Sequence, residues 1–521
     1  MSGGWAVWSA LAVLDGLIEQ GLRYLVVCPG SRSAPLVYAA QARQRDLDLW
    51  VRLDERSAGF SALGLALADR TGLAGVVTTS GTAAANLHPA MVEASHAGVR
   101  LIALTADRPA ELQGVGANQT IDQRDLFAAA PRLSQTLQAA DAAPDLAVWR
   151  AAGTRAGHAA HGRWSARPGP VHLNLRFRDP LTPPSPGEEG ADAALCGEGV
   201  GAVTPSLPPL HLGHRPQRAG VGEGTPGGGG GFGAPPEHAR EGRGEVEVSG
   251  AAPGWGGVSG RPSGDAVLCG GGGGVDAPGG VGEGTSGGVV LGRGVRTVVV
   301  AGDGAGPEAR VLAEQAGWPL LAEPSSGAWA GHAVVPSPEV AAAGPLGDAV
   351  QRVVMFGRPT LWRALNRLVT RQDIELVVIN PAGAPWPDLG GHADLVATSA
   401  SAEPGPADDA AWLAEWRRGG DAAWRRAWGG GELLTGPVVA GMVASSCADR
   451  GMALVAAASG AVRDLGCGPP PGELRVFASR GAAGIDGTIS TAAGVARALG
   501  EPVRVLVGDL AFLHDAGGLL R

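Results

Sequence analysis

The residues of this sequence best suited to chemistry are charged side chains in short turns. Arg32 stands between two serines in VVCPGSRSAPL, directly after an apolar run, and Glu55 follows another such run in LDERSAGF. An arginine offers a carboxylate a planar, permanently charged fork of donors. Taken singly, however, such a glutamate more often caps a helix, and such an arginine more often forms a surface ion pair. Both residues therefore need support from elsewhere in the sequence.

The composition excludes several classes of site. All 41 basic residues are arginines, so the chain has no lysine for a Schiff base, for a cofactor or for a P-loop. The net charge is −9 and the basic residues form no run, which disfavours nucleic acid as a partner. An anionic small substrate stays open, because local charge decides its binding.

The cysteines and the N-terminal segment indicate the compartment. The five cysteines are scattered, odd in number and without CxxC spacing: Cys28, Cys196, Cys269, Cys447 and Cys467. This pattern favours neither a disulfide framework nor a zinc site, and we expect a cytoplasmic protein. Residues 1–24 contain Asp15 and Glu19 and lack a basic start, so they resemble an amphipathic helix more than a signal peptide. No apolar run reaches the ~18 residues of a membrane span, so we expect no stable membrane insertion.

Helices and strands must position these turns, and residues 22–105 show a repeating pattern of both. Short β-rich runs (RYLVVC, LDLWVRL, AGVVTT, VRLIALT) alternate with helical patterns, and GPVHLNLRFRDPL at 169–181 adds a last strand. Such alternation predicts βαβ units and a parallel sheet, with functional loops at the carboxyl ends of the strands. A second unit begins at RTVVVAGDG, and a third begins near 410 and includes VRVLVGD. The turn VVVAGDGAG resembles a nucleotide-binding turn but matches GxGxxG poorly.

A glycine-rich segment separates the first unit from the second. Residues 201–290 contain 30 glycines and few large apolar side chains, so they cannot bury enough surface to offset the entropy of ordering. A glycine-rich nucleotide loop is the alternative, but such a loop stands between a strand and a helix. We expect domains at 1–185, 294–405 and 406–521, with a disordered linker at 186–293. The predicted fold is α/β, with three successive doubly wound parallel-sheet domains.

Several longer stretches carry a family resemblance. The stretch TTSGTAAANLHP…DQRDLF (78–127), with CPGSRSAPL and DERSAGF, resembles thiamine-diphosphate enzymes. Within them it is most similar to the menaquinone-pathway synthases of 2-succinyl-5-enolpyruvyl-6-hydroxy-3-cyclohexene-1-carboxylate. SRGAAGIDGTISTAAGVARALG (479–500) and VGDLAFLHD (507–515) resemble the second cofactor domain of the same enzymes. The resemblance makes 1–185 a pyrimidine-binding domain and 406–521 a diphosphate-binding domain.

The resemblance implies thiamine diphosphate and Mg²⁺ (or Mn²⁺) as cofactors. Glu55 matches the carboxylate that hydrogen-bonds N1′ of the aminopyrimidine, Ile485 matches the apolar residue that supports the bent cofactor, and Asp509 matches the first metal ligand. The cofactor-binding residues implied in this way are Glu55, Thr79, Ser80, Gly81, Asn86, Ile485, Gly508 and Asp509.

The resemblance also implies the reaction. The enzyme decarboxylates 2-oxoglutarate and adds the resulting succinyl-semialdehyde carbanion to isochorismate, and both substrates are dicarboxylates that arginine suits. The implied substrate-binding residues are Ser31, Arg32, Arg108, Asn118, Gln119, Arg363, Ser459, Arg463 and Arg480. The resemblance implies catalytic roles for Glu55, Gln119 and Arg32. The family pattern implies self-association, as a homodimer or a dimer of dimers.

The C-terminus departs from the family pattern. The family's metal motif continues to an asparagine-containing segment, whereas this sequence stops 12 residues after Asp509. We therefore expect the third domain to be incomplete, by C-terminal truncation. An active carboligase and a truncated, non-catalytic remnant both fit the sequence. A different thiamine-dependent 2-oxo acid decarboxylase is a further alternative, which the number of matched arginines disfavours.

Overall fold

The structure is a computed structural model that describes residues 4–138, 143–183, 287–381, 386–405, 410–427 and 434–520. All of them belong to one compact unit, made of residues 1–208 and 283–521. Most of the predicted linker, 186–286, lies outside the described residues. Its last residues, predicted to be disordered, include a short strand, β7 (Val289–Leu291), which pairs with β13 (Ala400–Ala402).

The first sheet has six parallel strands. Their order is β2 (Asp48–Val51), β1 (Leu22–Val27), β3 (Leu73–Thr78), β4 (Leu101–Asp107), β6 (Val171–Arg176) and β5 (Leu133–Gln138). Every residue of β3 and β4 is buried, as expected for apolar strands covered on both faces of a parallel sheet. All the strands predicted in this region are present, and β5 is an additional one. The carboxyl ends of β1, β3 and β4 adjoin one another in this order.

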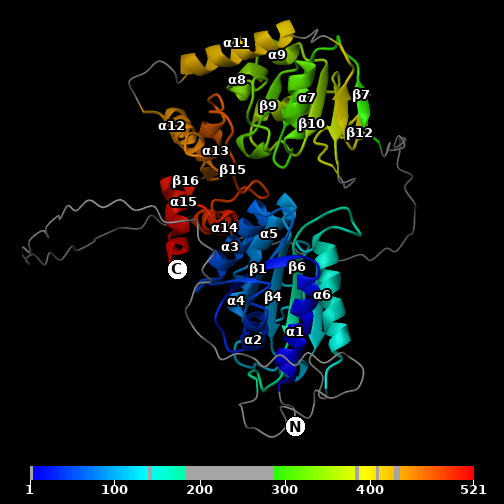
Figure 1. The fold of residues 1–521 in the computed structure, drawn as a ribbon, viewed down its shortest axis with the longest axis vertical. Coiled ribbons are helices and arrows are strands. Elements are labelled where there is room, and N and C mark those ends of the chain that lie inside the picture. Colours follow the sequence, from blue (N-terminus) through cyan, green and yellow to red (C-terminus); the bar gives the residue numbers. More distant parts are fainter. Residues whose placement is uncertain are drawn as a thin grey trace, which may run out of the picture. The chain divides into compact units, whose positions relative to one another are not determined.

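Helices cover both faces of this sheet (Figure 1). One apolar cluster joins the sheet to α1 (Trp5–Ile18), α2 (Ala34–Ala42) and α6 (Leu146–Ala160), and another joins it to α3 (Glu55–Ala68) and α5 (His88–Ala97). The prediction of an amphipathic N-terminal helix is only half right. α1 is helical, but ten of its 14 residues are buried, because it packs against both α6 and α2.

A second parallel sheet lies in residues 297–397. Its strand order is β12 (Leu395–Ala397), β11 (Glu375–Ile379), β10 (Arg352–Phe356), β8 (Thr297–Ala301) and β9 (Leu320–Ala322). Its helices are α7 (Glu308–Ala316), α8 (Pro338–Ala342), α9 (Pro345–Asp348), α10 (Arg363–Val369) and α11 (Ala410–Ala427). The strands are almost wholly buried, as their continuous apolar sequences predict.

The third sheet is smaller. It consists of β15 (Val476–Phe477), β14 (Ala453–Ala456) and β16 (Val503–Leu506), all parallel, with α12 (Gly436–Ala448), α13 (Gly460–Leu465), α14 (Thr488–Leu499) and α15 (Asp509–His514). The predicted α/β fold class is therefore confirmed. Within the described stretches, no helix combines the length and apolar character that crossing a membrane requires.

Helices α3 and α14 pack against each other through small residues. A Cβ atom on Gly64 would lie 2.0 Å from the carbonyl oxygen of Thr491, and one on Gly494 would lie 2.1 Å from that of Ser61. Both distances are far below van der Waals contact, so the two backbones touch only because glycine occupies these positions. This contact joins the helix that begins at Glu55 to the helix that follows Ile485.

We expect Gly494→Ala to destabilise the fold, because the new methyl group must push α14 away from α3. Overpacking of this kind costs about 1–3 kcal/mol. Gly441 in α12 is the matched control, since a Cβ there meets nothing within 4 Å and alanine favours a helix by about 0.5–1 kcal/mol. Thermal unfolding of both variants checks this. An equal midpoint for Gly494→Ala and Gly441→Ala would contradict the proposed tight contact.

Candidate active site

The loops after β1 and β3 lie against each other at the carboxyl edge of the first sheet. A Cβ atom on Gly30 would lie 2.4 Å from the Cβ of Thr79, so the turn that carries Ser31 and Arg32 rests on the turn that carries Thr79. Ser31 is exposed and Thr79 is half-buried. In a parallel sheet this edge is where ligands bind.

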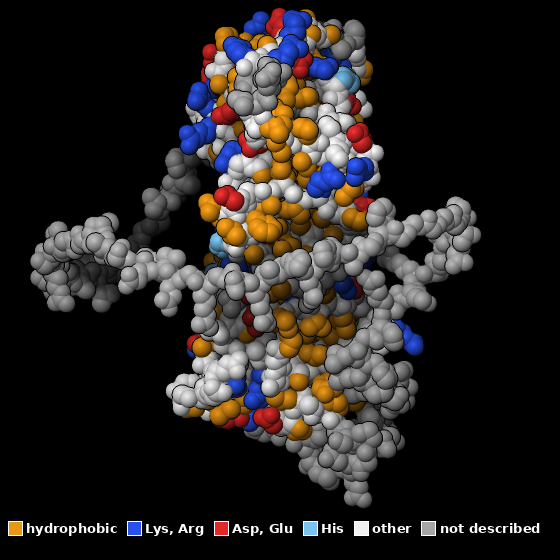
Figure 2. All heavy atoms as spheres, turned by 90° about the vertical axis from the view of Figure 1, so that its left-hand side faces the viewer, with side chains coloured by type: hydrophobic (Ala, Val, Ile, Leu, Met, Phe, Trp, Pro, Cys, Tyr) orange, Lys and Arg blue, Asp and Glu red, His pale blue; other side chains and the backbone are white. Residues whose placement is uncertain are grey.

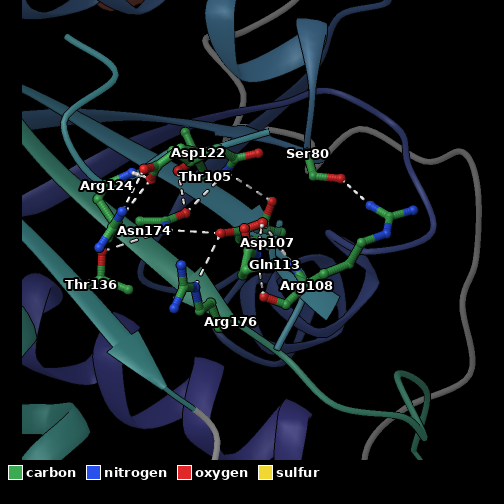
Figure 3. Close-up of polar contacts among 12 residues, drawn as sticks. Ser80, Thr105, Asp107, Arg108, Gln113, Asp122, Arg124, Thr136, Asn174 and Arg176 are labelled. Carbon is green, nitrogen blue, oxygen red and sulfur yellow. Dashed lines mark hydrogen bonds and ion pairs between the residues drawn. The ribbon is translucent and has the colours of Figure 1, made fainter. Parts of the chain in front are cut away.

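Arg108, Ser80 and Gln119 form a hydrogen-bonded cluster at this edge. Nη1 of Arg108 donates to Oγ of Ser80 and, at 3.0 Å, to the carbonyl oxygen of Gln119. The Ser80 hydroxyl donates to the same carbonyl at 2.9 Å, and Nε2 of Gln119 donates back to the Ser80 carbonyl at 2.9 Å. Figure 3 shows Arg108 extended toward Ser80. Three of the predicted residues, up to 39 positions apart in the sequence, are thus in direct contact, and Asn118 is exposed beside them.

Asp107 supports this cluster by accepting a hydrogen bond from the backbone of Arg108. It is fully buried and accepts hydrogen bonds from the Arg108 amide at 2.7 Å and from Nδ2 of Asn174 at 3.0 Å (Figure 3). Nε2 of Gln113 at 3.1 Å and Nε of Arg176 at 3.3 Å complete its surroundings. A buried carboxylate needs such partners. Asp107 was not predicted from the sequence, although a charged residue that ends an otherwise apolar strand is a usable signal.

Gln123 links this network to the turn after β3. Its Oε1 accepts from the Gly81 amide at 2.9 Å, and its Nε2 donates to Oδ1 of Asn174 at 3.0 Å. Asn174 also accepts from Oγ1 of Thr105, which lies 2.8 Å from His172. Burial lowers the pKa of His172 to about 4, so this ring is neutral near pH 7. Gln123 and Asn174 were also missed, because their partners lie far away in the sequence.

Arg32 brings a second guanidinium to the same edge. It is mostly buried, and its Nη1 donates to the Phe177 carbonyl at 3.2 Å and to Oδ2 of Asp179 at 3.3 Å. Burial, and then the positive charge of Arg32, lower the pKa of Arg108. Asp179 is exposed and screened by solvent. The edge therefore favours an anionic ligand.

Glu55 is the first residue of α3 and is half-buried. The cap of this helix is Asp54, whose carboxylate accepts the Ser57 amide at 2.7 Å. Among the described residues, the Glu55 carboxylate has no hydrogen bond or ion pair. Burial and the charge of Glu55 raise the pKa of Cys28, at the end of β1, so Glu55 lies close to that strand end. The capping role that the sequence left open for Glu55 therefore belongs to its neighbour.

The segments around Ile485 and Asp509 lie along α3. A Cβ on Gly487 would lie 1.9 Å from the ring of Phe60, and Nη2 of Arg56 donates to the His514 carbonyl at 2.8 Å. Ile485 is half-buried, and Gly508, Asp509 and Asn86 are exposed. In the part of the chain that the structure describes, no three His, Cys, Asp or Glu side chains group into a metal site. Asp509 therefore belongs to no such group among these residues.

Arg363 and Arg463 share a cavity of about 600 Å³, whose other walls include Glu339, Trp362 and Cys467. Both arginines are exposed, and Ser459 precedes the helix that carries Arg463. The described contacts do not join this pair to the cluster around Arg108. The structure therefore brings the predicted residues together in two groups.

Arg480 is held by the protein itself. It is 4% exposed and donates to Oγ1 of Thr360 at 3.0 Å, to the Thr360 carbonyl at 2.9 Å and to the Ala458 carbonyl at 3.1 Å. Thr360 comes three residues before Arg363, and Ala458 comes just before Ser459. Arg480 thus ties together the two segments that carry the second group.

The sequence is similar to those of known proteins. A family described as "Thiamine pyrophosphate enzyme, N-terminal TPP binding domain" matches residues 8–126. The 2-succinyl-5-enolpyruvyl-6-hydroxy-3-cyclohexene-1-carboxylate synthase of Kineococcus radiotolerans is 44% identical, over 98% of this chain and 79% of that protein. Proteins of the same name from Renibacterium salmoninarum and a Nocardioides species are 37% and 38% identical, over 98% and 99% of this chain and 77% and 79% of their own lengths. The chain belongs to this synthase family.

The site fits the thiamine diphosphate that the synthase family implies. The half-buried carboxylate of Glu55, which has no partner among the described residues, lies at a strand end beside the turn that carries Thr79, Ser80 and Gly81. Buried Thr78, immediately before that turn, has a hydroxyl that likewise contacts no hydrogen-bond partner in the described part of the chain. These free groups suit an aminopyrimidine, which presents ring nitrogens and an amino group.

Glu323 binds the segment that leads into Arg363. It is 1% exposed and accepts from the amides of Thr360 and Leu361 at 2.5 and 2.7 Å, and from Oγ1 of Thr360 at 3.0 Å. Burial raises its pKa from 4.5 to about 7. Since Thr360 accepts two hydrogen bonds from Arg480, Glu323 fixes the arginine indirectly.

The raised pKa predicts a pH dependence. Between pH 4.5 and about 7, Glu323 holds a proton in the folded chain but not in the unfolded chain. The stabilisation of the fold by this bound proton is therefore fully present below pH 4.5 and is lost as the pH rises toward 7. The size is at most about 3.5 kcal/mol, from roughly 1.4 kcal/mol per pKa unit. We expect Glu323→Gln to remove this component from denaturation curves measured at several pH values. Exposed Glu308→Gln is the control, and parallel wild-type and Glu323→Gln profiles would contradict the assignment.

Proposed function

We propose that this chain decarboxylates 2-oxoglutarate and joins the remaining four-carbon unit to isochorismate by conjugate addition. The products are 2-succinyl-5-enolpyruvyl-6-hydroxy-3-cyclohexene-1-carboxylate and CO₂, with uptake of one proton. The observation that carries this proposal is the Arg32–Arg108 pair beside Ser80 and Gln119, at the strand ends next to an unpaired Glu55. Family membership supports the same reaction.

Thiamine diphosphate, when bound, supplies the nucleophilic carbon and the electron sink that 2-oxo acid decarboxylation needs. We assign Glu55 to hydrogen-bond N1′ of its aminopyrimidine, a role for which the carboxylate is free because Asp54 caps the helix. Thr79, Ser80, Gly81 and Asn86 would line the pyrimidine, and Ile485 would support the cofactor from the other side. Glu55 would then hold or release a proton at N1′.

We assign Gly508 and Asp509 to the diphosphate end. Asp509 is the exposed first residue of α15, and its carboxylate would supply one oxygen ligand to Mg²⁺ or Mn²⁺. Such ions commonly take one or two protein carboxylates and complete their shell with phosphate oxygens and water. The single carboxylate of Asp509 therefore suits a metal ion that binds together with the diphosphate.

The two groups of arginines suit two dicarboxylates. Arg32 and Arg108 would hold isochorismate, with Ser31, Asn118 and Gln119 as neutral hydrogen-bonding partners. Arg363 and Arg463 line a separate cavity, with Ser459 at the start of the same helix as Arg463, and Arg480 fixes the segments that carry them. Because guanidinium groups stay charged at every physiological pH, both groups remain cationic during the reaction.

We also propose self-association and a cytoplasmic location. Hydrophobic side chains gather at several places on one face of the molecule (Figure 2). Large exposed apolar residues include Met442 on α12 and Leu510 and Leu513 on α15, which are 60–69% exposed. Exposed apolar groups of this kind favour a protein interface, and we propose a homodimer or a dimer of dimers. The described cysteines Cys28, Cys447 and Cys467 are free thiols, in keeping with a reducing compartment.

We expect Glu55→Gln to abolish exchange of the C2 proton of bound thiamine diphosphate, because an amide cannot take up the proton that the carboxylate holds at N1′. Proton NMR after acid quench measures this exchange. Glu308→Gln is the matched control, since Glu308 is also the first residue of a helix, α7, and is exposed. Near-normal exchange in Glu55→Gln would refute the assignment of Glu55.

We expect Arg32→Ala to impair coupling to isochorismate by about ten- to a hundredfold, the effect of losing one charged hydrogen bond. Decarboxylation of 2-oxoglutarate alone, followed by CO₂ release, should change much less. Arg155→Ala on the exposed side of α6 is the control. Equal loss in both half-reactions would assign Arg32 to the other substrate or to the fold.

A further inference from the structure

Glu93, on α5, binds a loop that lies almost 400 residues further along the chain. Its side chain is 4% exposed. Oε1 accepts from the amide of Gly481 at 2.6 Å, and Oε2 accepts from the amides of Ala482 at 2.6 Å and Ala483 at 3.1 Å. Three consecutive backbone amides thus converge on one carboxylate.

The backbone of this loop adopts a conformation that needs outside support. Ala483 has a φ of 58°, in the left-handed region that residues with a Cβ atom rarely occupy. Successive amides that turn to one side form a concave binding place for an anion, and here a carboxylate of the same chain fills it. The conformation of the loop and the charge of Glu93 therefore depend on each other.

The loop is held from two further directions. A Cβ on Gly481 would lie 2.3 Å from the carbonyl oxygen of Glu93, so the loop backbone rests directly on α5. Nη2 of Arg358 donates to the carbonyl oxygen of Arg480 at 2.8 Å. Glu93 is the one carboxylate that these amides contact among the described residues, and its described hydrogen bonds all come from them.

The loop carries two residues of the proposed site. Arg480 precedes the three amides, and Ile485 follows Ala483 by two positions. The side chain of Arg480 has its own partners in Thr360 and Ala458, whereas Ile485 is held through its backbone, whose carbonyl oxygen accepts from Oγ1 of Thr488 at 3.1 Å. The position of Ile485 therefore depends on the backbone that Glu93 binds.

We propose that Glu93 is a positioning residue, whose carboxylate fixes the backbone of residues 481–483 and thereby holds Ile485 ready for thiamine diphosphate. The identity of the ligand, thiamine diphosphate, rests on the proposed function, whereas the contact between Glu93 and the loop does not depend on that function. Glutamine is a close isostere that cannot replace Glu93. Its amide nitrogen would face one of the backbone N–H groups, donor against donor.

The test uses the full chain and two measurements. Hydrogen–deuterium exchange without cofactor reports the amides of 481–483, and calorimetric titration with thiamine diphosphate and Mg²⁺ reports affinity. For Glu93→Gln we expect exchange in the segment 480–487 to rise about tenfold or more, with β3 and β14 unchanged, and cofactor affinity to fall about tenfold. Asp394→Asn is the control, because it removes a carboxylate–amide bond to Leu376 elsewhere.

A second substitution separates positioning from general stability. Adding Ala483→Gly to Glu93→Gln should restore part of the cofactor affinity, because glycine adopts the left-handed conformation without strain. The midpoint of chemical denaturation, measured on the same variants, separates this local effect from a change in global stability. If Glu93→Gln does not fold, Gly481→Ala tests the same contact, since its methyl group must displace the loop from α5.

The outcomes are distinct. Wild-type exchange at 481–483 and wild-type affinity in the variant overturn the proposal, and so does a rise in exchange throughout the chain. Absence of thiamine diphosphate binding by the wild type contradicts the proposed function instead. In that case the exchange measurement, made without cofactor, still decides whether Glu93 holds the loop.

Discussion

The close contact of α3 and α14 is the constraint on which the rest of the structure depends. Gly64 and Gly494 allow the two backbones to touch, and a methyl group at either position would overlap a carbonyl oxygen of the other helix. One of these helices begins at Glu55, and the other follows the loop that carries Ile485. A contact between small residues therefore fixes how the helix that begins at Glu55 packs against the helix that follows Ile485, and Glu93 adds a second connection between the two domains.

Permanent positive charge is the second organising feature. Because every basic residue is arginine, each cation of the site remains charged, and the protein must position it by hydrogen bonds. Arg108 is oriented by Ser80 and Gln119, while buried Asp107 binds its backbone amide. Arg480 shows the other use of the same side chain, since its guanidinium connects segments of the chain. The arginines thus differ in role. Arg32 and Arg108 lie at the sheet edge where a ligand is expected, whereas Arg480 holds segments of the protein together.

The sequence predicted the strands well, because buried parallel strands are continuous apolar runs that their own residues specify. It also predicted which turns carry the site, through motifs that resemble a family. It missed Asp107, Gln123, Glu93 and Glu323, since the partners of a polar side chain are not encoded near it. It also left open whether Glu55 caps its helix. Only the three-dimensional arrangement showed that Asp54 takes this role and leaves Glu55 without a partner.

The sequence by itself determined the α/β class and the family, and it predicted which residues carry the chemistry. Local periodicity and short motifs are sufficient for these, because they depend on neighbours a few positions apart. The tertiary structure decided which of those residues meet. It placed Arg32 beside Arg108, joined Arg480 to Thr360 and Ala458, and set three amides of a strained loop on Glu93. Such contacts join segments hundreds of residues apart, and they form only when the packing of whole helices and sheets brings the backbone of one segment within hydrogen-bonding distance of another.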